Sequence, residues 1–118
     1  MRKSCFECVL KHLGSAGVFV KETKMGYPKY AIWVIGELEH AADECLEVHR
    51  ELAMVIREHR ITWYEKRHAI PFEAIGEYVE VCMSAEYQGI PFPEIPQELY
   101  DGLDMEDGKP VFHGDTRP

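Results

Sequence analysis

The sequence has few of the features that would assign it to a common functional class. Only four cysteines, Cys5, Cys8, Cys45 and Cys82, occur among 118 residues. They are too few and too unevenly spaced for a secreted disulfide scaffold. No glycine-rich phosphate loop and no nucleophile-elbow pattern is present, which argues against a nucleotide-using enzyme or a hydrolase. The longest apolar run, residues 30–35, is far too short to span a bilayer, so no membrane partner is expected.

Basic residues are also scarce. The chain has 13 Lys and Arg against 21 Asp and Glu, which gives a net charge of −8. Nucleic-acid backbones and anionic membrane surfaces need clustered positive charge, so neither is expected as a partner. No signal peptide precedes the cysteines. We therefore expect a cytoplasmic protein with reduced thiols, where cysteines more often serve metal binding or redox chemistry.

What the chain does contain is helical periodicity. Apolar residues recur at helical spacing through four segments, which predicts an all-α fold, a compact bundle of about four helices. The expected helices cover residues 4–24, 28–48, 51–66 and 71–88. Residues 1–89 would form the helical bundle domain, and residues 90–118 a Pro-rich C-terminal extension.

The C-terminal extension holds five of the seven prolines together with many apolar residues. Proline prevents a long helix there, whereas a purely disordered tail is usually poorer in large apolar side chains. We expect residues 90 to about 103 to pack in extended or single-turn form against the bundle or a second subunit.

The first helix begins with a Cys-x2-Cys-x3-His pattern made of Cys5, Cys8 and His12. Ser4 suits the N-cap, and Glu7 stands three residues later as in a capping box. Free backbone N–H groups and the positive end of the helix dipole then favour thiolates at this helix start. Thiolates there can ligate a metal ion or attack a disulfide or peroxide.

A helical hairpin that turns near Gly26 would bring further ligands to this place. Partners in an antiparallel pair are roughly equidistant from the turn, so His12 should lie opposite His40 and Cys8 opposite Glu44. Each pair, Cys8/His12 and His40/Glu44, is spaced four residues apart and lies on one helix face.

Thiolate and imidazole ligands favour zinc with tetrahedral coordination. The expected ligands are Cys5, Cys8, His12 and His40, with Glu44 as the fourth ligand if Cys5 takes no part, or as an outer partner. The sequence thus favours a small intracellular zinc-binding helical protein with a structural or regulatory role exerted through protein contacts. A homodimer is compatible with this interpretation. A third interpretation, in which these cysteines and histidines only pack the core, also stays open.

The alternative function is a thiol-dependent redox enzyme of the peroxidase or disulfide reductase type. The Cys-x2-Cys-x3-His pattern is similar to the active-site motif of the alkylhydroperoxidase D and carboxymuconolactone decarboxylase families. The resemblance covers residues 5–12 and implies that Cys5 and Cys8 form the redox pair and that His12 relays protons. Whether the protein is an enzyme is left open by the sequence.

A Glu-x2-His pattern, Glu37 to His40, is typical of carboxylate-bridged di-iron bundles. Such sites need a second copy of the pattern and further glutamates from other helices. The other copy in the chain, Glu65 to His68, runs past the expected end of its helix at residue 66. A di-iron centre is therefore not favoured.

Overall fold

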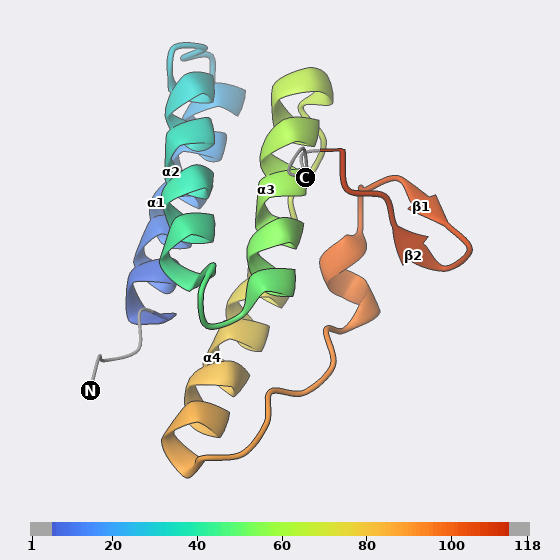
Figure 1. Cartoon of the computed structure of the whole chain (residues 1–118). Coiled ribbons are helices and arrows are strands. Elements are labelled where there is room, and N and C mark those ends of the chain that lie inside the picture. Colours follow the sequence, from blue (N-terminus) through green and yellow to red (C-terminus); the bar gives the residue numbers. More distant parts are fainter. Residues whose placement is uncertain (1–5, 114–118) are drawn as a thin grey trace.

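A computed structural model describes residues 6–113 as a bundle of four helices followed by a C-terminal segment that lies against it (Figure 1). The helices are α1 (Phe6–Lys24), α2 (Tyr30–Cys45), α3 (Arg50–Lys66) and α4 (Phe72–Gln88). The prediction of an all-α bundle of about four helices is confirmed. Ser4 and Cys5 lie outside the described residues, so the predicted cap and the first thiol of the pattern are not described.

Helices α1 and α2 form the predicted antiparallel hairpin, side by side in Figure 1. The turn depends on Gly26, whose φ of +106° is a conformation that residues with a side chain rarely adopt. The shared interface buries small and medium apolar residues, among them Leu13, Ala16, Val34 and Leu38. Small residues allow two helix backbones to approach closely, and this approach brings side chains of α1 and α2 together along the hairpin.

Helix α2 ends earlier than its predicted limit at residue 48, because His49 starts a new helix. The backbone of His49 leaves the helical region, and its side-chain Nδ1 accepts a hydrogen bond of 3.2 Å from the N–H of Leu52. A side chain that satisfies a free N–H at a helix start is an N-cap. His49 therefore lies at a break between α2 and α3, between the predicted helices 28–48 and 51–66.

Two buried polar side chains of α3 form hydrogen bonds to its neighbours, one to α2 and one to the C-terminal segment. The indole N–H of Trp63 donates to the carbonyl oxygen of Ala31 in α2, at 3.1 Å. One turn earlier in α3, His59 is fully buried, and its Nε2 lies 2.7 Å from the carbonyl oxygen of Leu99 in the C-terminal segment. A buried polar group is tolerated only with a partner, so these bonds fix α3 relative to both neighbours.

The C-terminal segment packs on the bundle as predicted. Ile95, Leu99 and Leu103 are buried and belong to the same apolar core as the helices. Leu99 lies in a short 3₁₀ helix, η1 (Gln97–Tyr100), which is the predicted single turn. The segment ends in a two-stranded hairpin, β1 (Met105–Glu106) and β2 (Lys109–Pro110), around the turn at Asp107 and Gly108.

Two histidines set the position of the segment between η1 and β1. Because the Leu99 carbonyl can only accept, His59 Nε2 carries a proton, and its Nδ1 accepts from Nε2 of His68 at 3.0 Å. Gly102 lies beside His68, and a Cβ at that position would stand 2.3 Å from the His68 ring. Gly102 also has a φ of +90°, so both its backbone and its close contact require glycine.

None of the helices found within residues 6–113 is long and apolar enough to cross a membrane.

We predict that acid destabilises the protein through His59. Burial lowers the pKa of His59 to about 4, from the ordinary 6.5. Between these values the unfolded chain binds a proton that the folded chain does not, so stability falls as the pH drops from 6.5 towards 4. The contribution of His59 is about 3 kcal/mol, measurable by urea denaturation at several pH values.

The variant His59→Gln should show a shallower loss of stability in acid, because its neutral amide can replace both hydrogen bonds without titrating. His113→Gln is the matched control, since His113 is exposed and bonded to Asp104. An equally steep loss in wild type and His59→Gln would contradict this account.

Candidate functional site

Two histidines from neighbouring helices meet on one face of the α1–α2 hairpin. The rings of His12 and His40 are stacked, with centroids 5.2 Å apart and planes inclined by 29°. The predicted placement of His12 opposite His40 is confirmed. The hairpin register follows from the turn at Gly26, as the sequence predicts.

A carboxylate orients one of these imidazoles. His12 Nδ1 lies 2.7 Å from Oε1 of Glu37, and both side chains are about three-quarters buried. An ionised carboxylate only accepts, so Nδ1 carries a proton, and in the neutral imidazole Nε2 then keeps its lone pair. A carboxylate bonded to the other ring nitrogen is the usual outer-shell arrangement of metal-ligating histidine. We call His12, Glu37 and His40 the hairpin cluster.

Cys8 precedes His12 by one turn, but it lies outside the core. Its side chain is exposed, whereas Phe6 and Val9 take the buried positions of this turn. The interpretation in which Cys8 packs the core is therefore wrong. A thiol on this surface is accessible to a metal ion or to an oxidant.

The remaining predicted ligands are less well placed. His40 is exposed and Glu44 is partly buried, and the carboxylate bonded to His12 is that of Glu37. Within residues 6–113, no three His, Cys, Asp or Glu side chains stand in an arrangement that could hold a metal ion. The described part of the chain thus contributes two adjacent imidazoles with an orienting carboxylate, and a complete site needs Cys5 or a rearrangement of side chains.

Of the three described cysteines, only Cys8 is exposed enough to act as a reactive or metal-binding thiol. Cys45 and Cys82 are buried free thiols. Burial raises the pKa of Cys45 to about 12 and also raises the pKa of Cys82. Because the thiolate is the reactive form, both behave as packing residues, as the third interpretation proposes for cysteines generally.

No protein-family model matches this chain, and no significant match occurs among curated proteins or solved structures. The function is therefore argued from the residues themselves.

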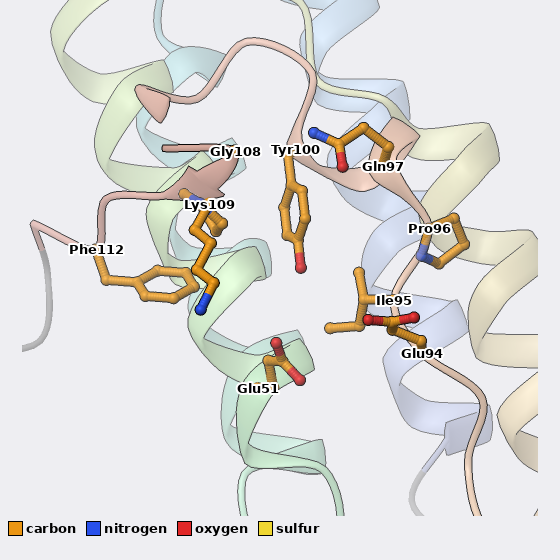
Figure 2. A pocket seen from close by; sticks show the side chains of 10 residues that line it. Glu51, Glu94, Ile95, Pro96, Gln97, Tyr100, Gly108, Lys109 and Phe112 are labelled. Atoms are coloured by element: carbon orange, nitrogen blue, oxygen red, sulfur yellow. The ribbon is translucent and has the colours of Figure 1, made fainter. Parts of the chain in front are cut away.

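A pocket lies between α3 and the C-terminal segment, and no pattern in the sequence predicts it. This pocket has a volume of about 790 Å³ (Figure 2). Its charged lining residues are Glu51 from α3, Glu94, and Lys109 from β2. They are far apart in the sequence and meet only because the C-terminal segment folds back onto α3.

We predict that Glu37 sets the tautomer of His12. In ¹⁵N-detected NMR, the neutral imidazole of His12 should carry its proton at Nδ1, the less common tautomer. In Glu37→Ala the proton should move to Nε2, because the acceptor that holds it at Nδ1 is gone. His40→Ala serves as the control and should leave the His12 tautomer unchanged. A neutral His12 protonated at Nε2 alone in wild type would rule out the orienting role of Glu37.

Proposed function

We propose that this protein binds a zinc-like metal ion at the N-terminal end of the α1–α2 hairpin. The ligands would be Cys5, Cys8, His12 and His40, with Glu44 as the replacement for Cys5. The main observation in support is the hairpin cluster, in which Glu37 holds Nδ1 of His12 and leaves Nε2 free to ligate. The role we assign to the ion is structural or regulatory.

The chemistry of the donors supports zinc over harder ions. Two thiolates and two imidazoles form a set that zinc binds tetrahedrally, whereas calcium and magnesium prefer oxygen ligands. Glu37 would act as an outer partner that fixes the ring orientation and raises the basicity of His12. Metal binding would draw His40, which is exposed on α2, out of its stacked position.

A thiol-dependent redox activity is the second candidate. Cys8 is an exposed thiol one helical turn from His12. The Glu37 carboxylate that would orient His12 as a metal ligand would equally orient it as a base. In this function Cys5 and Cys8 would be the redox pair of a peroxidase or disulfide reductase. The two candidates differ in what occupies the thiols, a metal ion or a transient disulfide.

Protein contacts, a homodimer included, belong to the same proposal. Ile32 and Trp33 on α2 are 71% and 52% exposed, and Met25 and Tyr27 in the preceding turn are also exposed. Neighbouring exposed apolar side chains of this size commonly mark interaction surfaces. We place the protein in the cytoplasm in this proposal, because free thiols persist there.

Metal analysis tests the first candidate. Protein purified without a histidine tag should contain about one zinc ion per chain, and a chelator should lower its melting temperature because the ion stabilises the folded state. Glu37→Gln should weaken zinc binding by roughly tenfold or more, and His12→Ala by a larger factor. His113→Ala, an exposed histidine elsewhere, is the control.

The zinc proposal would be contradicted if the purified protein contains no metal and if neither a chelator nor added zinc changes its melting temperature. Rapid alkylation of one thiol near neutral pH, together with an intramolecular Cys5–Cys8 disulfide under mild peroxide, would then favour the redox candidate.

We predict that Ile32→Lys weakens self-association without unfolding the chain. Ile32 is mostly exposed, so lysine costs little in the monomer, but it places a charge in any apolar interface formed there. Sedimentation should shift towards the monomer, with the melting temperature of the monomer nearly unchanged. Tyr87→Lys on α4, at a side chain that is 94% exposed, is the matched control. Identical sedimentation of wild type and Ile32→Lys would show that this surface does not mediate self-association.

A further inference from the structure

The pocket between α3 and the C-terminal segment shares no residue with the hairpin cluster. At about 790 Å³ it is within the size range of small-molecule sites. One side is formed by Glu51 of α3, and the other by residues around η1 and the β1–β2 hairpin (Figure 2). The site depends on the contacts that hold the segment in place, among them the His59–Leu99 hydrogen bond and the buried Leu99 side chain.

The walls combine aromatic and aliphatic surfaces. The rings of Tyr100 and Phe112 stand on opposite sides of Lys109 in Figure 2, and Ile95 lies beyond the Tyr100 hydroxyl. Proline rings from residues 96 and 110 complete the apolar part of the lining. Such walls can bury an apolar body of a ligand, and aromatic faces also attract cations.

Negative charge predominates in the interior of the pocket. Glu51 and Glu94 both line it, and the Tyr100 hydroxyl points towards them (Figure 2). The ion pairs found within residues 6–113 use other carboxylates, among them those of Glu37, Glu39, Asp43 and Asp104. Neither pocket carboxylate has a cationic partner among the described residues.

The pKa of the Tyr100 hydroxyl is consistent with a negative electrostatic potential in the pocket. Burial raises the pKa of Tyr100, and the charges of Glu51 and Glu94 raise it further. Lys109 also lines the pocket, but its charge is not among the causes of the shift in the pKa of Tyr100. Two carboxylates and one ammonium leave the lining with a net charge of −1, which a monovalent cation would balance.

We propose that this pocket binds a small organic cation, with one ammonium or guanidinium group carried on an aromatic or aliphatic body. The cationic group lies between Glu51 and Glu94, where the Tyr100 oxygen accepts a further hydrogen bond. The body packs against the rings of Tyr100 and Phe112. The ammonium of Lys109 repels a second positive charge, so a monoamine is preferred over a polyamine.

Calorimetric titration of the full chain with phenethylammonium chloride tests this assignment. The cation should bind at least about tenfold more tightly than its neutral analogue 2-phenylethanol, because each charge-assisted hydrogen bond contributes at least that factor. The affinity should fall with added salt. In ¹H–¹⁵N spectra, the amides of Tyr100, Lys109 and Phe112 should shift, and those of the hairpin cluster should not.

Variants separate the proposed contacts from general surface charge. Glu51→Gln and Glu94→Gln should each weaken phenethylammonium binding by about tenfold, whereas Lys109→Gln should leave it unchanged or tighter. Glu106→Gln, at an exposed carboxylate of β1 outside the lining, is the matched control and should bind as wild type does. Melting temperatures of all four variants show whether each is folded.

Three results would overturn the proposal. They are equal affinity for amine and alcohol, wild-type affinity in both Glu51→Gln and Glu94→Gln, and spectral shifts that avoid the pocket. Tighter binding of a capped lysine-containing tetrapeptide than of phenethylammonium would replace the small cation with a basic peptide. Because no residue is shared with the proposed zinc site, the outcome is independent of the metal analysis.

Discussion

The arrangement of the C-terminal half depends on one buried hydrogen bond, from Nε2 of His59 to the carbonyl oxygen of Leu99. A fully buried imidazole without a partner would cost several kcal/mol, so the chain after α4 has to deliver an acceptor to this position. Leu99 does so from η1 while its own side chain fills the core. His68 then supplies the donor that His59 Nδ1 needs, which draws the α3–α4 connection to the same place. A second bond of this kind runs from the Tyr78 hydroxyl of α4 to the carbonyl of Pro93.

The two candidate sites differ in how firmly the fold builds them. The hairpin cluster lies on two long helices whose spacing is fixed by small buried residues, and the Glu37–His12 bond is made within that rigid frame. The pocket is formed by a segment with little regular structure, and its walls are positioned by only a few anchors in the core. Rigid helices favour the close ligand geometry that a metal ion demands. A pocket on irregular structure suits a ligand held by charge and apolar contact, which tolerate small displacements.

Charge links the two proposals. The chain carries a net charge of −8, and both candidate ligands are cations. The negative field of the whole molecule would raise the local concentration of any small cation, so selectivity has to come from the sites. The hairpin cluster selects by imidazole and thiol donors, which prefer soft metal ions. The pocket selects by the apolar body that its aromatic walls can bury, a feature that a metal ion lacks.

Sequence alone determined the elements that depend on local periodicity. The buried face of α3, made of Leu52, Val55, Ile56, His59 and Trp63, follows the helical spacing that predicts this helix. The hairpin turn at Gly26 was enough to place His12 opposite His40. Periodicity did not decide whether Cys8 is buried. In the first turn of α1 the buried positions are those of Phe6 and Val9, and Cys8 is exposed.

Tertiary structure alone decided the rest. From the sequence, Glu37 stands out only as part of a di-iron-like pattern, since its contact with His12 depends on helix rotation and side-chain conformation. Glu51 and Glu94 share no local pattern at all. They line one pocket because the segment after α4 folds back to satisfy His59, and that requirement arises only once α3 is buried.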